Sequence, residues 1–225
     1  MALILQIETA TTACSVALSK DGQTVSYCER NAPNIHASQL TLFIEDVLKQ
    51  VSVTFSDLDA VAVSKGPGSY TGLRIGVSTA KGLCYALDIP LIGVDTLEAM
   101  AAGFRSSGQW PTGPQLLCPM IDARRMEVYM EVFDADLTSV QPVQAVILTE
   151  ATFDQYGEVV LFGDGAKKCK ALYAQKAHVH IVDFENSARH LSEPCHKKFM
   201  KRQFENVAYF EPFYLKEFVA GKPKA

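Results

Sequence analysis

The sequence has no excess of basic residues and no paired cysteines. Lysine and arginine number 21 against 25 aspartate and glutamate residues, for a formal net charge of −4. A protein that binds nucleic acid by itself usually carries a basic field, so this balance argues against a chain devoted to nucleic acid alone. The six cysteines occur singly, several of them within apolar runs such as Gly82–Leu87. Such cysteines favour reduced, buried thiols in the cytosol over a disulfide framework.

The sequence also has no long apolar run. No segment approaches the roughly 18 consecutive apolar residues that cross a bilayer. The N-terminal stretch Met1–Thr9 is apolar only over the length of a strand and has no basic residue, so we do not expect a signal peptide. With 225 residues, 48% of them hydrophobic, the chain can bury one large core or two small ones. These features predict a soluble, cytoplasmic protein that does not contact a membrane.

Strand and helix patterns alternate in the first half of the chain. Leu3–Ile7 is a continuous apolar run, typical of a strand buried on both faces. Asp21-Gly22 is a strong hairpin signal between two further strand patterns. Apolar residues at helical spacing predict helices over His36–Gln50 and Gly72–Leu87. The expected elements are strands 3–7, 14–18 and 24–28, helix 36–50, strand 60–64, helix 72–87, strand 91–94 and helix 96–104.

The segment Arg105–Pro114 breaks all periodicity and predicts a domain boundary. After it we expect strands 115–121, 126–133, 143–148, 159–162 and 179–182, with helices over 166–175 and within 187–205. Three strands open each half, and this layout predicts an α/β protein of two tandem ribonuclease-H-like units, the actin/sugar-kinase/Hsp70 (ASKHA) superfold. The predicted domains are 1–106 and a smaller, degenerate 107–225, in which Cys195–Ala225 would pack back on the first domain.

The most distinctive segment is Gly66–Gly76, with the sequence GPGSYTGLRIG, between an expected strand and an expected helix. Gly66 and Gly68 allow backbone conformations that a Cβ would forbid. Such a loop can present free N–H groups at a helix N-terminus to an anion or to the backbone of a partner. It is not a Walker A loop, because no Gly-Lys-Ser/Thr follows at the required spacing. A tight strand-to-helix connection and a phosphate cradle both stay open.

Phosphate chemistry has few candidate residues in this chain. Glu8 follows the first strand and could hold a metal–nucleotide complex, with Thr9 bonded to a phosphate, but a lone carboxylate at a strand end is as often a solvated rim residue. In the second half, Asp122–Arg125 (DARR) stands where a phosphate-binding hairpin would need small residues. We prefer a charged turn with an Asp122–Arg ion pair there. Gly163–Gly165 weakly resembles a second phosphate turn, although Asp164 would repel phosphate.

Metal ligands and nucleophiles have weaker signals still. The five histidines, at 36, 178, 180, 190 and 196, have no further ligands at metal-binding spacing, so a packing role is favoured for each. No G-x-S-x-G elbow occurs, and the hydroxyls of Ser69 and Thr71 are better placed to cap the next helix. We therefore expect no metal site and no catalytic residue.

Four segments together resemble the TsaB (YeaZ) family: Ile7–Ala10, Lys65–Gly76, Gly93–Leu97 and Ile121–Arg124. The resemblance covers nearly all of the first half and reaches about Tyr129. TsaB proteins are non-catalytic partners of their catalytic paralogue TsaD in bacterial synthesis of tRNA threonylcarbamoyladenosine (t6A). The resemblance implies a scaffold subunit that binds and activates TsaD for threonylcarbamoyl transfer to N6 of adenosine 37 in ANN-decoding tRNAs.

TsaD-like chemistry is replaced at three places in this sequence. The two metal-binding histidines of TsaD correspond to Thr96 and Met100, its acidic pair to Thr12 and Ala13, and its glycine hairpin to Asp122–Arg125. The resemblance thus implies that the chain catalyses nothing and binds no cofactor by itself, with ATP or ADP only at an interface of the complex. The residues expected near such a nucleotide are Glu8, Thr9, Lys65, Gly66, Gly68 and Ser69.

The resemblance places the partner contact on helices 36–50 and 72–87. Gly72, Gly76 and Ala80 form a small-residue stripe that would let a TsaD helix approach closely, unless the stripe faces the protein's own sheet. The same surface would form a homodimer in isolation, the ATPase TsaE would dock on the pair, and tRNA would be met only through the complex. The expected interface residues are His36, Leu40, Phe43, Val47, Tyr70, Gly72, Leu73, Gly76, Val77, Ala80 and Leu83.

Two other functions stay open from the sequence. One is a stand-alone enzyme, either ATPase/kinase-like or peptidase-like, which would require a metal or a nucleophile–base pair. The other is a homodimeric interaction module for a different partner, which shares the exposed helices but not the dependence on TsaD.

Overall fold

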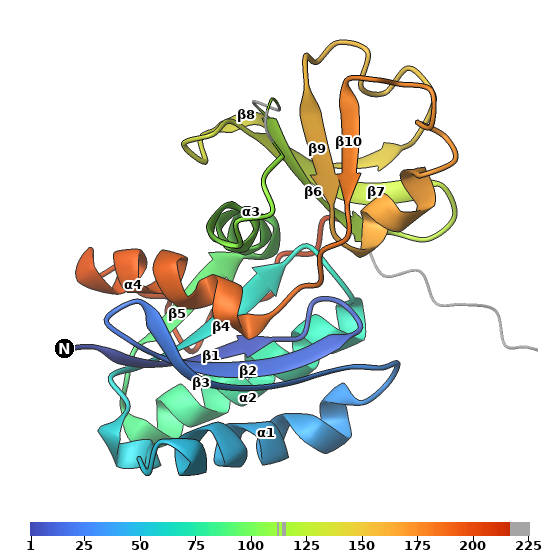
Figure 1. Ribbon diagram of the computed structural model, residues 1–225. Coiled ribbons are helices and arrows are strands. Elements are labelled where there is room, and N and C mark those ends of the chain that lie inside the picture. Colours follow the sequence, from blue (N-terminus) through green and yellow to red (C-terminus); the bar gives the residue numbers. More distant parts are fainter. Residues whose placement is uncertain (112, 114–115, 217–225) are drawn as a thin grey trace, which may run out of the picture.

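Two five-stranded sheets form the framework of the protein in the computed structural model, which describes residues 1–111, 113 and 116–216 (Figure 1). The first sheet has the order β3-β2-β1-β4-β5 and the second the order β8-β7-β6-β9-β10. In each half the first three strands pair antiparallel, and the last two add in parallel on the other side of the first strand. The two halves therefore share one topology, which confirms the predicted tandem units.

Each expected strand is present, and the start differs most for the expected strand 143–148, which begins at Ser139. Long apolar runs form the central strands of the first sheet, which are buried on both faces. The strands of the first half are β1 (Leu3–Glu8), β2 (Ala13–Lys20), β3 (Gln23–Asn31), β4 (Ala60–Gly66) and β5 (Leu91–Asp95). Those of the second half are β6 (Leu116–Asp122), β7 (Glu127–Phe133), β8 (Ser139–Ile147), β9 (Val159–Phe162) and β10 (Val179–Val182).

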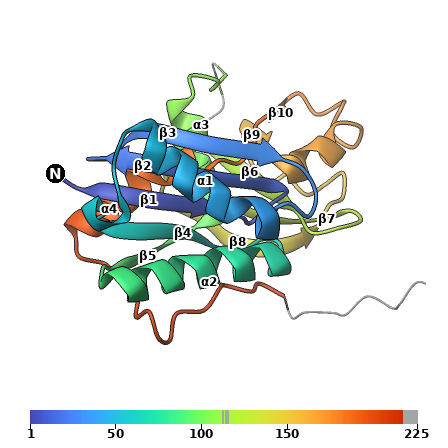
Figure 2. The same cartoon turned by 90° about the horizontal axis from the view of Figure 1, so that it is seen from below.

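Helices cover both faces of the first sheet. The helices α1 (His36–Gln50) and α2 (Tyr70–Leu87) lie side by side on one face, as Figure 2 shows from below. The helices α3 (Thr96–Ser106) and α4 (Ser192–Met200) lie on the other (Figure 1). Three 3-10 helices complete the fold: η1 (Phe55–Asp57), η2 (Asp164–Cys169) and η3 (Ala188–Leu191). None of the helices in the described part of the chain is long and apolar enough to cross a membrane.

One expected helix is wrong. The segment 166–175 forms the 3-10 helix η2 and turns instead of an α-helix. Gly163 takes a φ of +99°, and a Cβ on Gly165 would lie 2.9 Å from the backbone of Ile121 in β6. The close contact with β6 sets the backbone conformation at the start of this segment. Tertiary packing therefore overrides the local preference for an α-helix. Gln115 and Glu217–Ala225, which were assigned to an expected strand and to the C-terminal segment, lie outside the described residues.

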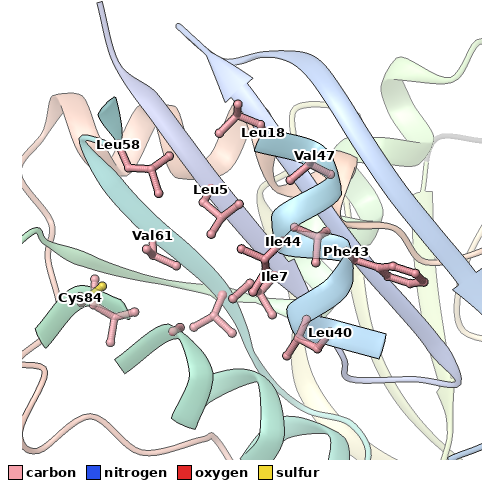
Figure 3. Close-up of a cluster of buried hydrophobic side chains, with 14 of the residues drawn as sticks. Leu5, Ile7, Leu18, Leu40, Phe43, Ile44, Val47, Leu58, Val61 and Cys84 are labelled. Atoms are coloured by element: carbon pink, nitrogen blue, oxygen red, sulfur yellow. The ribbon is translucent and has the colours of Figure 1, made fainter. Parts of the chain in front are cut away.

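The core of the first half lies between its sheet and the pair α1 and α2. Leu5 and Ile7 of β1 and Val61 of β4 point toward Ile44 of α1 (Figure 3), and all four side chains are buried. Burial of each such side chain contributes about 1.5–3 kcal/mol. The inner faces of both helices are thus committed to this core, which leaves their outer faces to solvent.

Aromatic rings join the two halves. Phe104 of α3 stacks on Phe162 of β9 with ring centroids 4.2 Å apart. Phe184, in the crossover that leads from β10 back to the first half, meets both rings edge-on at 5.5 Å and 5.4 Å. Such pairs add to the free energy gained from burial alone. This cluster sets the position of the second sheet over α3.

The C-terminal segment Lys201–Lys216 lies along the first half. Glu205 N donates to Leu91 O (2.9 Å) at the start of β5, and Phe213 N donates to Lys65 O (2.7 Å) near the end of β4. Between them, the Phe210 ring covers Gly93, where a Cβ would lie 2.9 Å from it. The segment therefore supplies part of the first half's core from the far end of the chain.

We expect Phe210→Ala to lower the free energy of unfolding by about 3 kcal/mol, because the ring is 9% exposed and its removal leaves a cavity over β5. Urea denaturation followed by circular dichroism measures this. The neighbouring Tyr209 is 84% exposed, so Tyr209→Ala should change stability by about 0.5 kcal/mol or less. Equal decreases in the free energy of unfolding of the two variants would show that the segment does not place Phe210 in the core.

Candidate functional site

The glycine loop packs against the β1–β2 connection. Ser69 N donates to Ala10 O (2.7 Å), and a Cβ on Gly68 would lie 2.4 Å from the same oxygen. Ser69 Oγ accepts from Gly72 N (3.3 Å) and so caps α2, as expected. The loop thus forms the tight strand-to-helix connection, and Gly68 is required by its close contact with Ala10.

The remaining residues expected beside a nucleotide also have internal partners. Thr9 Oγ1 donates to Gly72 O (2.8 Å), and Lys65 forms an ion pair with Asp95 (3.2 Å). A Cβ on Gly66 would clash with Phe213 O of the C-terminal segment. The Thr9 hydroxyl and the Lys65 ammonium group are therefore bonded within the chain, whereas the buried oxygens Glu8 Oε2, Ser64 Oγ and Thr96 Oγ1 at the same end of the sheet have no hydrogen-bond partner among the described residues.

The inner face of α2 meets its own sheet. Gly72 and Gly76 lie against Thr9, where a Cβ would come within 2.0 Å and 2.2 Å of its oxygen atoms, and Ala80 is fully buried. The structure thus shows the alternative in which the Gly72–Gly76–Ala80 stripe faces the sheet. The other expected interface residues that are buried are His36, Leu40, Phe43, Val47, Leu73 and Val77. Among the expected interface residues, only Tyr70 and Leu83 are partly exposed.

The outer face of α2 carries a second small-residue stripe that the sequence analysis missed. Ser78, Gly82 and Ala86 are exposed and four residues apart, and a Cβ on Gly82 would have no neighbour within 4 Å. Tyr85 on the same helix is 85% exposed and Leu42 on α1 is 50% exposed. We call these five residues the open face. The spacing was visible in the sequence, but only the docking of α2 decides which stripe is open.

Glu8 is fully buried at the end of β1, so it is not a solvated rim residue. Burial raises its pKa to about 7, although hydrogen bonding from Ala10 N and the nearby side chains of Ser64 and Asn186 oppose the rise. The hydrogen bond from Ala10 N to Glu8 Oε1 is 2.6 Å long. The Glu8 carboxyl group is therefore enclosed by protein atoms and does not face solvent.

The β6–β7 turn is filled by a lysine. Lys168 Nζ donates to Asp122 Oδ1 (2.7 Å), to Arg125 O (2.8 Å) and to Glu127 O (2.6 Å). The expected Asp122–Arg ion pair is therefore wrong, because η2 carries Lys168 into the turn and its ammonium group takes the carboxylate. Asp164 Oδ1 in turn accepts from Asp122 N (3.0 Å), and burial raises the pKa of Asp164.

Two of the five histidines lie in structural surroundings, and His180 Nε2 lies 3.0 Å from Glu158 Oε2 at the surface. Burial lowers the pKa of His190 to about 4, and its neutral ring stacks on Phe184 at 4.7 Å. His36 Nε2 lies 3.3 Å from Ala13 O. Across the described residues, no three or more His, Cys, Asp or Glu side chains gather to hold a metal ion.

A hollow of about 690 Å³ lies between the end of β3, the end of α3 and the crossover 183–190. Its wall includes Glu29 and Arg189, which form an ion pair at 3.1 Å, together with Arg30 and Asn186. Ser187 Oγ and Ser15 Oγ both donate to Glu29 Oε2 (2.5 Å and 3.1 Å), which ties the crossover to β2 and β3. The lining contains both positive and negative side chains. Its hydrogen bonds and its ion pair join the crossover 183–190 to β2 and β3.

The buried carboxyl group of Glu8 makes stability depend on pH. Its pKa is 4.5 when unfolded and about 7 when folded, so the folded state binds the extra proton and is favoured at low pH. As pH rises from 4.5 through 7, this stabilisation, about 3 kcal/mol, is lost. Urea denaturation across pH 5–8 should therefore show Glu8→Gln gaining stability over the wild type as pH rises.

A matched control for this prediction is Glu45→Gln, on the exposed side of α1, which should leave the pH profile unchanged. Parallel profiles for the wild type and Glu8→Gln would contradict the raised pKa of the buried carboxyl group.

Solved structures share this fold. YeaZ from Pseudomonas aeruginosa is 24% identical and matches 96% of this chain and 100% of its own, with a TM-score of 0.81. The activator of the 2-hydroxyisocaproyl-CoA dehydratase from Clostridium difficile, solved with bound ADPNP, is 9% identical and matches 91% of this chain and 98% of its own, with a TM-score of 0.51. These likenesses confirm the predicted ASKHA superfold.

The sequence comparisons agree with one another. Residues 30–213 match the family model described as TsaD, tRNA N6-adenosine threonylcarbamoyltransferase. The tRNA threonylcarbamoyladenosine biosynthesis protein TsaB of Escherichia coli K12 is 33% identical over 230 residues, which cover 97% of this chain and 96% of that protein. With its two tandem units and its glycine loop packed on the β1–β2 connection, the chain belongs to the TsaB family of tRNA threonylcarbamoyladenosine biosynthesis proteins.

Proposed function

We propose that the chain is a non-catalytic subunit that binds the threonylcarbamoyltransferase TsaD through its open face and holds it in an active form. TsaD would then transfer the threonylcarbamoyl group to N6 of adenosine 37 in ANN-decoding tRNAs. The observation that carries the proposal is the exposed stripe Ser78–Gly82–Ala86, with empty space over Gly82. A stripe of this kind lets the backbone of another helix approach closely.

The chemistry of this face fits a protein partner. Tyr85 and Leu42 offer apolar surface on two neighbouring helices, and aromatic side chains are enriched where proteins meet. Ser78, Gly82 and Ala86 carry no charge that a partner would have to desolvate. The partner surface that fits this face is therefore a second pair of helices that present apolar side chains. A homodimer through the same face would form in the absence of TsaD.

The groups in the β6–β7 turn and the glycine loop support a scaffold over a stand-alone enzyme. Lys168 places its ammonium group inside the β6–β7 turn, and Ser69 N of the glycine loop is bonded to Ala10 O. Both turns that would bind phosphate in a nucleotide-dependent relative are thus occupied by the chain's own atoms. We accordingly propose that ATP or ADP is bound only where this chain meets its partners, and that the ATPase TsaE docks on the assembled pair.

The open face is tested by Gly82→Arg. A bulky charged side chain in this open position would hold a partner helix away, while the fold has room for it. We expect the heterodimer peak with TsaD, seen by size-exclusion chromatography with light scattering, to weaken at least tenfold or disappear. Thermal unfolding of the chain alone should shift by only a few degrees. Gly76→Arg is unsuitable, because its Cβ would lie 2.2 Å from Thr9 Oγ1 and disrupt the fold.

The matched control is Gly157→Arg, because Gly157 is also exposed and a Cβ added there would have no neighbour within 4 Å, but it lies in the second half. This variant should bind TsaD like the wild type. A folded Gly82→Arg protein that still forms the complex would exclude the open face as the interface. Turnover of ATP or a peptide by the purified chain would instead support a stand-alone enzyme.

A further inference from the structure

The β6–β7 turn contains two consecutive arginines in an unfavourable backbone conformation. Arg124 has a φ of 75° and Arg125 a φ of 50°. Residues with a Cβ seldom adopt this left-handed region, which favours glycine, asparagine and aspartate. The β2–β3 turn of the same chain has φ values of 50° and 81° and fills them with Asp21 and Gly22, which suit the geometry. Local preference therefore does not account for arginine at either position.

The turn is also held rigidly by its neighbours. Asp122 Oδ1 accepts from Arg124 N (2.6 Å), and Glu127 N donates to Arg124 O (3.1 Å). Lys168 Nζ binds the Arg125 and Glu127 carbonyls from inside the turn. The backbone that carries the two arginines is thus fixed, and both side chains are exposed.

Neither guanidinium group has an acidic partner among the described residues. The acids that flank them in the turn are already engaged, because Asp122 pairs with Lys168 (2.7 Å) and Glu127 pairs with Lys216 (2.5 Å). The turn therefore presents two unneutralised positive charges on a protein whose net charge is −4.

Basic and aromatic groups continue beside this turn. Burial raises the pKa of the Tyr129 phenol; the positive charge of Lys216 opposes the rise, the negative charge of Glu127 adds to it, and the positive charge of Arg124 opposes it. Tyr214, two residues before Lys216, packs on Tyr70 with ring centroids 4.8 Å apart. Basic side chains that pair with phosphate and aromatic side chains that stack on bases are both used by proteins that bind RNA.

We propose that Arg124 and Arg125, supported by Lys216, contact the sugar–phosphate backbone of a structured RNA. The planar guanidinium group matches phosphate oxygens with two parallel hydrogen bonds, and a fixed turn loses little entropy on binding. The inference rests on the proposed function in that the RNA would be the tRNA that TsaD modifies. In this inference the chain contacts the tRNA directly, whereas the sequence led us to expect that tRNA is contacted only through the complex.

The test variant is the double substitution Arg124→Asn and Arg125→Gly. Both new residues suit the left-handed backbone, so the turn should stay folded and its melting temperature should be unchanged or higher. Fluorescence anisotropy with a labelled tRNA transcript, at several KCl concentrations, gives the Kd for the chain alone and for its complex with TsaD. We expect binding about tenfold weaker, and a slope of log K against log salt smaller by about one to two.

The matched control is Arg202→Gly. Arg202 is also exposed and left-handed, with a φ of 52°, but it follows α4, which ends at the left of Figure 1, whereas β6 and β7 lie at the right. This variant removes one arginine charge from the same kind of backbone position, against two in the double variant. It should bind the transcript like the wild type.

The outcomes separate this inference from the proposed function. If the double variant binds the transcript like the wild type at every salt concentration, or if no wild-type form binds it, the RNA contact is excluded. If the double variant loses the TsaD complex instead, the turn binds an acidic protein surface and the inference is overturned. If the wild-type chain fails to bind TsaD, the proposed function fails, and the transcript assay on the chain alone still decides the RNA contact.

Discussion

The close contact between Thr9 and the glycines of α2 is the constraint on which the surface of this protein depends. Gly72 and Gly76 bring the helix so near to the β1–β2 connection that no Cβ fits between them. Thr9 Oγ1 bonds to Gly72 O, so the helix cannot rotate without breaking that contact. This docking fixes which side of α2 is core and which is open. The exposed stripe over Gly82, and with it the proposed partner surface, is a consequence of the buried one.

The two halves share a topology but have different chemistry at corresponding turns. In the first half the β1–β2 connection is packed under the glycine loop through Ala10, and in the second half the β6–β7 turn is filled by Lys168. The fold is therefore the same in both halves, while the groups that fill the corresponding turns differ. A shared fold does not fix the chemistry of its sites.

Contacts far apart in sequence complete the arrangement. The stacked rings of Phe104 and Phe162 join the halves, and the C-terminal segment returns to cover β5 through Phe210. That same segment carries Lys216 to Glu127, which leaves the arginines of the β6–β7 turn without an acidic partner in the described part of the chain. The charge of this turn is thus decided by residues from three separate parts of the chain.

The sequence by itself determined most of the elements, the shared opening of the two halves and the family, because apolar periodicity, the Asp21-Gly22 turn and the Gly66–Gly76 loop are local signals. It did not determine the state of the 166–175 segment, the partner of Asp122, the burial of Glu8 or the open side of α2. Each of these depends on a contact between distant residues. The pattern of α2 offered two small-residue stripes, and only the approach of Thr9 decided which one is buried.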